Sequence, residues 1–248
     1  MAKDLFSQQA ASYARFRPTF PPELYDWVAG LAPARDLAVD VGTGNGQAAR
    51  ELGERFARVV AIDPSEAQLA NATPHPRVTY RRGEAEATGV DAGAADLVTA
   101  SQAFHWFDHP RFFAEARRVL RPRGAVAVWC YALTQITPEI DVVMMELYEG
   151  YLGTYWDPER RQVEKLYRDA VFPAGWQELA APPFAMQARW TRDQLVDYLG
   201  TWSALVKYKN ARGEDPLRVI VPKLEAAWGA AGERDVTWPV GMRAARLQ

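Results

Sequence analysis

One short glycine-rich segment, residues 42–46 with the sequence GTGNG, constrains the fold of this chain more than any other feature. It follows an apolar run at 37–41 and precedes residues 47–56, whose apolar side chains recur at helical spacing. Closely spaced glycines between a strand and a helix let a ligand approach the backbone, because no Cβ stands in the way and helix N–H groups face it. The segment therefore predicts a strand, a ligand-binding turn and a helix.

Strand-like and helix-like segments go on alternating through the first half of the chain. Short apolar or β-branched runs are separated by turn residues and by segments of helical periodicity. This alternation is typical of a mostly parallel sheet with right-handed crossovers and helices on both faces. We therefore expect a doubly wound, Rossmann-like α/β fold. The predicted strands are 37–41, 58–62, 77–80, 96–100 and 125–129, and the predicted helices are 21–31, 47–56, 65–72 and 110–120.

The pattern changes near residue 133. Long helical stretches interrupted by prolines follow, together with two segments that fit late strands returning to the sheet. We expect 1–132 to hold an N-terminal leader and the Rossmann-like core, and 133–248 to form a helical cap or insertion that completes the sheet, the two folding together as one integrated domain. The predicted helices are 140–152, 158–170, 191–205 and 216–228, and the late strands are 184–190 and 236–240.

Composition limits the class of partner. The chain has 29 basic and 31 acidic residues, for a net charge of −2, which gives no field to attract nucleic acid. The single cysteine, Cys130, and only three histidines argue against a disulfide framework or a metal site. The start of the chain has no signal-like apolar run, and no stretch of about 18 apolar residues occurs. We expect a cytoplasmic protein without metal or membrane contact, either a monomer or a dimer.

The glycine segment does not match two familiar phosphate-binding patterns. In the dinucleotide fingerprint the third glycine or alanine is the sixth residue, but here that position is Gln47 and the third glycine comes one place early. No Gly-Lys-Ser or Gly-Lys-Thr follows, which excludes a P-loop. Asp63, 21 residues after Gly42, stands where a carboxylate accepts both hydroxyls of a ribose. These residues alone leave both NAD and S-adenosylmethionine open as ligands.

The sequence VDVGTGNG at 39–46 resembles motif I of class I S-adenosylmethionine-dependent methyltransferases. Four further segments resemble the family in the same order: 61–65, 83–86, 94–106 and 118–124. The resemblance implies S-adenosylmethionine as cofactor, S-adenosylhomocysteine as product, and a set of cofactor-binding residues. These are the loop residues Gly42, Thr43, Gly44 and Gly46, the ribose-binding Asp63 and Pro64, the adenine-binding Glu84 and Ala85, Asp40 near the cofactor ammonium, and Ser101 and Gln102 at the active-site strand exit.

A closer likeness is to the methyltransferase type 11 group that includes trans-aconitate methyltransferase-like proteins. Residues 13–18, with the sequence YARFRP, resemble its N-terminal segment, and residues 200–204 resemble a segment in its C-terminal part. In relatives the leader folds over the methionine end of the cofactor. The resemblance therefore implies that Tyr13 and Arg17 contact the cofactor, with the guanidinium meeting its carboxylate.

His105 stands just past the fourth predicted strand and is the candidate general base. The alternative reading is that it orders a loop or closes the cleft through a hydrogen bond. Four other residues are candidates to line the acceptor pocket, although each also fits a packing role: Phe104, Trp106, Trp202 and Ser203. The candidates to clamp an anionic acceptor are Arg17, Arg189 and Arg192, the last two with surface positions as the alternative.

Methyl transfer mainly requires alignment and exclusion of water, so the acceptor decides whether a base is needed. By resemblance we expect a small-molecule acceptor, first of all a carboxylate oxygen, with carbon methylation of a quinone-like ring as another possibility. Residues 101–104 lack the Asn/Asp-Pro-Pro-aromatic pattern of many base-amino methyltransferases, which disfavours nucleic acid. Two alternatives stay open at this point: an NAD(P)-dependent oxidoreductase and a non-catalytic S-adenosylmethionine-binding protein.

Overall fold

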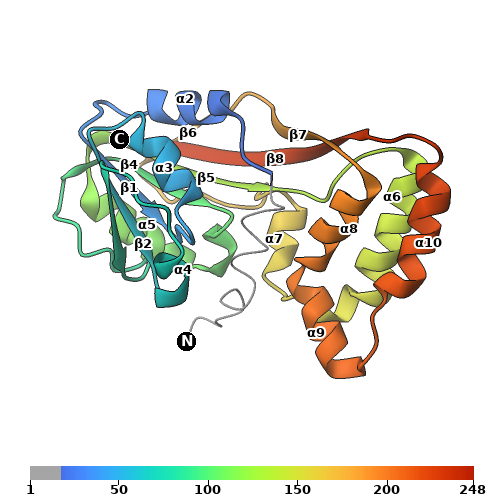
Figure 1. Cartoon of the computed structure of the whole chain (residues 1–248). Coiled ribbons are helices and arrows are strands. Elements are labelled where there is room, and N and C mark those ends of the chain that lie inside the picture. Colours follow the sequence, from blue (N-terminus) through green and yellow to red (C-terminus); the bar gives the residue numbers. More distant parts are fainter. Residues whose placement is uncertain (1–17) are drawn as a thin grey trace.

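The computed structural model describes residues 18–248 and shows one mixed sheet in the order β3-β2-β1-β4-β5-β8-β6, with β7 paired to β8 (Figure 1). The first five strands run parallel and form the Rossmann-like part. β1 is buried along its whole length, as expected for a strand covered on both faces. The predicted doubly wound α/β fold is confirmed. The parallel strands are β1 (Leu37–Val41), β2 (Arg58–Asp63), β3 (Val78–Arg82), β4 (Ala95–Ser101) and β5 (Leu120–Tyr131).

Helices cover both faces of the parallel strands. α2 (Pro22–Gly30) and α3 (Gln47–Gly53) pack against one face, and their buried side chains share one apolar cluster with Trp129. α5 (His109–Val119) contributes to the cluster on the other face. The short α4 (Glu66–Ala70) follows β2. Each turn from strand to helix therefore opens at the carboxyl edge of the sheet, where ligands bind in this architecture.

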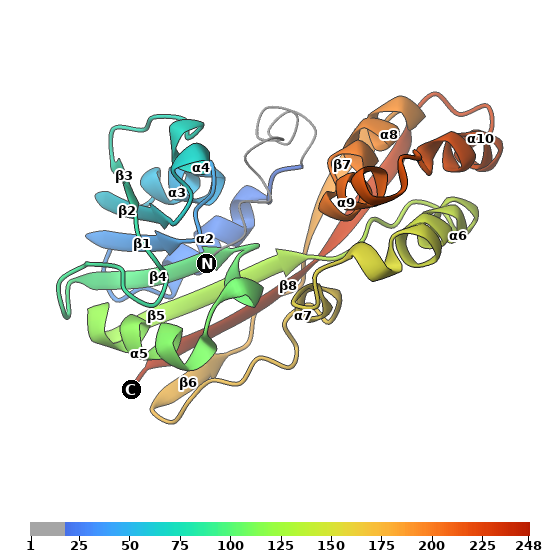
Figure 2. The ribbon, with the colours of Figure 1, turned by 90° about the horizontal axis from the view of Figure 1, so that it is seen from below.

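A long antiparallel strand, β8 (Arg234–Leu247), joins the two parts of the molecule (Figure 2). Its second half pairs with β5 and with β6 (Trp176–Leu179). Its first half continues beyond the Rossmann-like part as a ribbon with β7 (Phe184–Trp190). The same strand thus belongs to the sheet and supports the C-terminal helices.

The C-terminal helices form a cap at the outer end of this ribbon (Figure 1). They share an apolar core of their own that includes Met186, Val236 and Trp238 from the ribbon. α8 begins with a capping box in which Thr191 and Gln194 exchange hydrogen bonds, and α9 ends at Gly213. The elements are α6 (Pro138–Met145), the π-helical η3 (Glu146–Tyr151), the 3-10 turn η4 (Gly153–Tyr155), α7 (Arg160–Glu164), α8 (Arg192–Gly200), α9 (Ser203–Arg212) and α10 (Leu217–Trp228).

Three predicted elements of the second half were wrong in detail. The helix expected over 140–152 widens into the π-helix η3, and the helix expected over 191–205 is two helices separated at 201–202. The helix expected over 158–170 ends at Glu164, because Leu166 and Tyr167 take left-handed backbone conformations. The prediction also lacked β6, a short edge strand with half of its residues exposed. The corrections at 146–151, 166–167 and 201–202 fall around the pocket described below, whereas β6 lies at the edge of the sheet.

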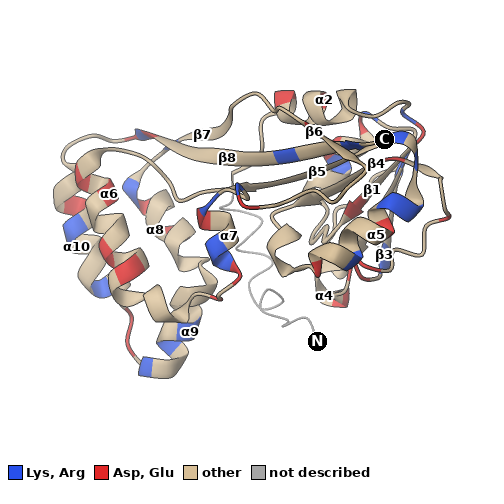
Figure 3. Cartoon of the chain, turned by 180° about the vertical axis from the view of Figure 1, so that it is seen from behind, with Lys and Arg blue, Asp and Glu red and all other residues tan. Residues whose placement is uncertain are grey.

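Acidic and basic residues are interspersed along the helices of both parts (Figure 3). Within residues 18–248, no helix combines the length and the hydropathy that a membrane crossing requires. The same described residues contain no group of three or more His, Cys, Asp or Glu side chains placed to hold a metal ion.

Candidate active site

The glycine loop leaves β1 and enters α3 through three residues with positive φ. Two of these glycines are required by the protein's own packing. A Cβ on Gly42 would lie 2.4 Å from the Cβ of Ala103, and a Cβ on Gly46 would lie 2.4 Å from the hydroxyl of Tyr80. At these two positions the loop is therefore pressed against neighbouring strands and turns.

Gly44 differs from its two neighbours. Its φ of +57° favours glycine, and among residues 18–248 the atom nearest to a Cβ there is the side-chain oxygen of Gln68 at 3.9 Å. No described residue therefore crowds the backbone at Gly44. Of the three glycines, it is the one whose missing side chain leaves room for a ligand.

Asp63 stands at the end of β2 and is held against the loop. Its two carboxylate oxygens accept hydrogen bonds from the backbone N–H of Gly44, at 2.8 Å, and of Ser65, at 2.9 Å. Pro64 lies between them in the turn to α4. These two bonds hold the carboxylate beside the glycine loop at the carboxyl edge of the sheet. A carboxylate at this position is the predicted ribose-binding group.

Asp40 lies on β1 beneath the loop and is fully buried. It accepts hydrogen bonds from the hydroxyls of Thr43, at 2.6 Å, and Thr99, at 2.7 Å. Burial raises the pKa of Asp40 to about 6, while these two hydrogen bonds act in the opposite direction. The residue thus orders the loop and supplies a negative charge that depends on pH.

The predicted adenine-binding turn follows β3. Glu84 is exposed and Ala85 is buried, and the backbone N–H of Gly83 donates to the carbonyl of Asp63 at 3.2 Å. This bond ties the turn to the ribose-side residue. Glu86, two residues on, accepts from the backbone N–H of Asp108 and so anchors the start of α5.

β4 ends at Ser101, and Gln102 then turns the chain with a φ of +56°. The backbone N–H of Gln102 donates to the carbonyl of Trp129, and its side-chain oxygen accepts from the N–H of Tyr131 at 3.1 Å. A non-glycine residue in this conformation is strained and is often found at a functional site. The strand exit is therefore locked to β5, with Gln102 facing the pocket.

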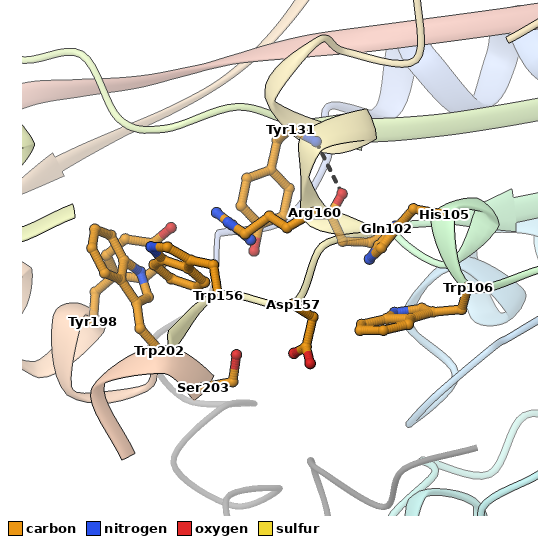
Figure 4. A pocket seen from close by; sticks show the side chains of 10 residues that line it. All are labelled: Gln102, His105, Trp106, Tyr131, Trp156, Asp157, Arg160, Tyr198, Trp202 and Ser203. Carbon is orange, nitrogen blue, oxygen red and sulfur yellow. Dashed lines mark hydrogen bonds between the residues drawn. The ribbon is translucent and has the colours of Figure 1, made fainter. Parts of the chain in front are cut away.

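A pocket of about 70 Å³, partly open to solvent, lies between this strand exit and the cap (Figure 4). Aromatic side chains from both parts of the molecule form most of its wall. The lining residues are Gln102, His105, Trp106, Tyr131, Trp156, Asp157, Arg160, Tyr198, Trp202 and Ser203.

The comparisons with known proteins agree with this geometry. The methyltransferase type 11 family model, described as a methyltransferase domain, matches residues 39–128. A methyltransferase-like protein of Dictyostelium discoideum is 33% identical over 247 residues, covering 96% of this chain and 93% of the relative. The chain belongs to the S-adenosylmethionine-dependent methyltransferases.

Two further similarities bear on this methyltransferase. A solved structure from Anaeromyxobacter dehalogenans, described as a candidate type II methyltransferase, has 48% identity and a TM-score of 0.86, covering 93% of this chain and 98% of that one. An uncharacterized methyltransferase of Mycobacterium tuberculosis is 38% identical over 126 residues, half of each chain. Family membership sets aside the nicotinamide oxidoreductase and the non-catalytic binding protein as alternatives.

His105 of the methyltransferase lines the pocket but is poorly suited to remove a proton. Its Nδ1 lies 2.9 Å from the hydroxyl of Tyr167, and burial lowers the pKa of His105 to about 3, with the charge of Arg160 acting in the same direction. Burial also keeps the pKa of Tyr167 well above its usual value. The contact with Tyr167 occupies Nδ1, and the lowered pKa makes the imidazole a weak base.

Tyr167 reaches His105 because the chain after α7 is bent sharply. Leu166 and Tyr167 have φ values of +54° and +57°, which are unusual for large side chains. A Cβ on Gly241 of β8 would lie 2.4 Å from the carbonyl oxygen of Leu166. Only a glycine lets this bend sit against β8.

The remaining predicted residues fall in different places. Trp106, Trp202 and Ser203 line the pocket, whereas Phe104 is fully buried in the core below it and packs against neighbouring aromatic rings. Phe104 is therefore outside the pocket wall. Two predicted clamp residues, Arg189 and Arg192, pair through their guanidiniums with surface carboxylates. Tyr13 and Arg17 lie outside the described residues.

Sequence reasoning missed Tyr131, Trp156, Asp157, Arg160 and Tyr198 as pocket residues. Tyr131 lies two residues after the predicted strand 125–129, which is the one available signal, since parallel strands end at the ligand-binding edge. The others belong to the cap, where no recognised motif marks them.

Proposed function

We propose that this methyltransferase methylates a small metabolite and that the methyl group goes to a carboxylate oxygen. When bound, S-adenosylmethionine supplies an electrophilic methyl group on a sulfonium. We assign its ribose to Asp63 and Pro64, its adenine to Glu84 and Ala85, and its ammonium end to the side of Asp40. The loop residues Gly42 to Gly46 and the exit residues Ser101 and Gln102 complete the cofactor site in this proposal.

The weak basicity of His105 carries the carboxylate assignment. A carboxylate is already ionised near pH 7, whereas an alcohol or a carbon acid must lose a proton. Among the described residues around the pocket, His105 has its pKa held near 3, and Asp157 forms an ion pair with Lys207. Neither is an effective base, so an acceptor that needs none suits this pocket best.

The pocket's enclosure supports a small acceptor. Trp156 and Trp202 lie with ring centroids 5.6 Å apart and face Trp106 across the pocket (Figure 4). Such walls exclude water from the reacting atoms and hold the acceptor in line. A flexible polymer substrate would need a more open entrance.

A screen that follows homocysteine formation tests the proposal. Carboxylic acids should be turned over, while the corresponding primary amides and alcohols should not. Turnover of phenols, quinone-like rings or amines with no turnover of any acid would overturn the carboxylate assignment. The likeness to trans-aconitate methyltransferases stays a prediction that the same screen examines.

A further inference from the structure

Arg160 is a cation that faces the pocket and was not part of any sequence motif. It starts α7 and points between Tyr131 and Trp156 (Figure 4). Its Nε donates a hydrogen bond to the hydroxyl of Tyr148 at 2.7 Å. Its two terminal nitrogens make no hydrogen bond or ion pair within residues 18–248. The outer edge of the guanidinium is therefore available to a ligand.

A short relay of hydrogen bonds fixes the inner edge. The hydroxyl of Tyr148 accepts from Arg160 and donates to Glu164 Oε1, both at 2.7 Å. Burial raises the pKa of Tyr148, so the phenol keeps the proton that the second bond needs. Tyr148 lies in the π-helix η3, a distortion frequently found at functional sites. The relay sets the direction in which the guanidinium points.

Stacking fixes the plane of the same group. The guanidinium carbon lies 4.2 Å from the ring centroid of Trp156 and 5.4 Å from that of Tyr148. Trp156 is itself anchored, since its indole N–H donates to the carbonyl of Tyr148 at 3.1 Å. A stacked guanidinium keeps its N–H donors in one plane, which matches the two oxygens of a carboxylate or phosphate.

The pocket has no described counter-ion for this charge. Apart from Arg160, the charged residue of its lining is Asp157, whose carboxylate is engaged by Lys207 Nζ at 2.6 Å. Glu164, at the far end of the relay, is linked to Arg160 through the hydroxyl of Tyr148 and is exposed to solvent. Neither carboxylate pairs directly with Arg160, so its guanidinium faces the pocket without an ion-pair partner among residues 18–248.

We infer that Arg160 binds an anionic group of the methyl acceptor and determines acceptor specificity, and that Tyr148 and Glu164 position it. The group it binds is not the reacting oxygen. That oxygen loses negative charge as it takes the methyl group, so a guanidinium on it would stabilise the bound acceptor more than the transition state. The inference rests on the proposed function only in taking this pocket as the acceptor site.

The test measures binding and turnover separately. Calorimetry of the protein loaded with S-adenosylhomocysteine uses succinate, glutarate and phthalate as probes, each beside its uncharged diamide. The wild type should bind at least one acid in preference to its diamide. Arg160→Gln should weaken that acid by about 10- to 100-fold, and Tyr148→Phe by about 3- to 10-fold. Arg161→Gln, an exposed neighbour on the same helix, is the matched control and should change nothing.

The outcomes separate the two proposals. No binding of any acid to the wild type, or unchanged acid binding in Arg160→Gln, overturns the role of Arg160. Acid binding that depends on Arg160 without methylation of any acid in the homocysteine screen supports Arg160 and overturns the carboxylate acceptor. For a turned-over acid, Arg160→Gln and Tyr148→Phe should raise KM with kcat and S-adenosylhomocysteine affinity unchanged. A fall confined to kcat would contradict the inference that Arg160 determines acceptor specificity.

Discussion

The two halves of the active site are built by different means. The proposed cofactor side is formed mainly by backbone groups and small residues. Gly44 leaves its backbone uncrowded by described side chains, and Asp63 accepts hydrogen bonds from the N–H groups of Gly44 and Ser65. On the acceptor side, large side chains such as Trp156 and Trp202 come from separate elements of the cap. The first side is local in sequence and the second is not.

This difference indicates which side of the active site can change its residues while the fold is kept. A glycine loop followed by an acid at the next strand end tolerates little change, because a Cβ at Gly42 or Gly46 would strike Ala103 or Tyr80. The cap wall depends on packing among aromatic rings, which other large side chains can also provide. We therefore expect substitutions on the two sides to affect different measurements.

Trp238→Ala should have the largest effect on stability. Trp238 is fully buried where the β7–β8 ribbon meets the cap, and it contacts Trp190 and Tyr198. Truncating such a side chain costs about 3–5 kcal/mol of unfolding free energy. Trp106→Ala is the control, because Trp106 is 41% exposed and should cost less than about 1 kcal/mol.

Urea unfolding followed by circular dichroism measures both costs. Because β8 belongs to the sheet and to the cap, loss of S-adenosylhomocysteine binding should coincide with the unfolding transition of Trp238→Ala. Persistent cofactor binding after the helices have melted would mean that the two parts unfold independently. It would also overturn the predicted integration of 1–132 with 133–248.

Asp63→Ala should have the next largest effect, now on the cofactor side. It removes the proposed acceptor of the ribose hydroxyls together with the acceptor for two loop N–H groups. We expect a loss of about 1.5–3 kcal/mol in S-adenosylhomocysteine binding, measured by calorimetry. Glu66→Ala changes a nearby exposed carboxylate and should leave affinity unchanged. Equal affinities in the two variants would refute the ribose assignment.

Asp40 should make cofactor affinity depend on pH. Its carboxylate forms only as pH rises through its raised pKa of about 6, and the charged form attracts the cofactor ammonium. S-adenosylhomocysteine affinity should therefore rise by up to about tenfold per pH unit below pH 6 and level off near pH 7. Asp40→Asn should flatten this profile, and a wild-type profile without a rise would contradict the assignment.

The same ionisation should act on stability in the opposite direction. The unfolded chain titrates this group near its ordinary value of 3.8. Asp40 therefore stabilises the fold most below that pH, and the contribution is lost as pH rises through about 6. Thermal unfolding without cofactor should show this trend in the wild type relative to Asp40→Asn.

His105→Gln should have the smallest effect. An imidazole whose pKa is lowered by burial to about 3 is a weak base, and the amide of glutamine can replace it in the hydrogen bond with Tyr167. Methylation of the acceptor found in the screen should stay within about threefold of wild type. A fall of about 10²–10⁴ in kcat would instead identify His105 as a general base and undo the argument for a carboxylate.

Much of the fold followed from the sequence because parallel strands and glycine turns leave local patterns. The apolar run 37–41, the loop after it and Asp63 at the end of β2 are all where the patterns put them. The cap was harder, since helix periodicity says nothing of a π-helix at 146–151 or of left-handed residues at Leu166 and Tyr167. Those features arise from contacts with distant elements, such as Gly241 on β8.

The acceptor side was harder still. Arg160 acquires its position from Tyr148 and Trp156, which precede it in a segment without a recognisable motif. Phe104 shows the converse, because a residue beside a motif proved to be buried in the core. Neighbourhood in sequence predicts the place of the glycine loop in the fold well and the pocket wall poorly.

The central claim, that the backbone at Gly44 is the cofactor's approach, is tested most directly by calorimetric titration of two matched variants with S-adenosylhomocysteine. Gly44→Ala and Gly213→Ala each place a Cβ on a residue with positive φ, at +57° and +70°, with no atom of residues 18–248 nearer than 3.9 Å. Both should lose similar stability, about 1–2 kcal/mol. We predict that Gly44→Ala weakens S-adenosylhomocysteine at least about tenfold while Gly213→Ala binds it like the wild type; equal affinities in the two variants would contradict the account.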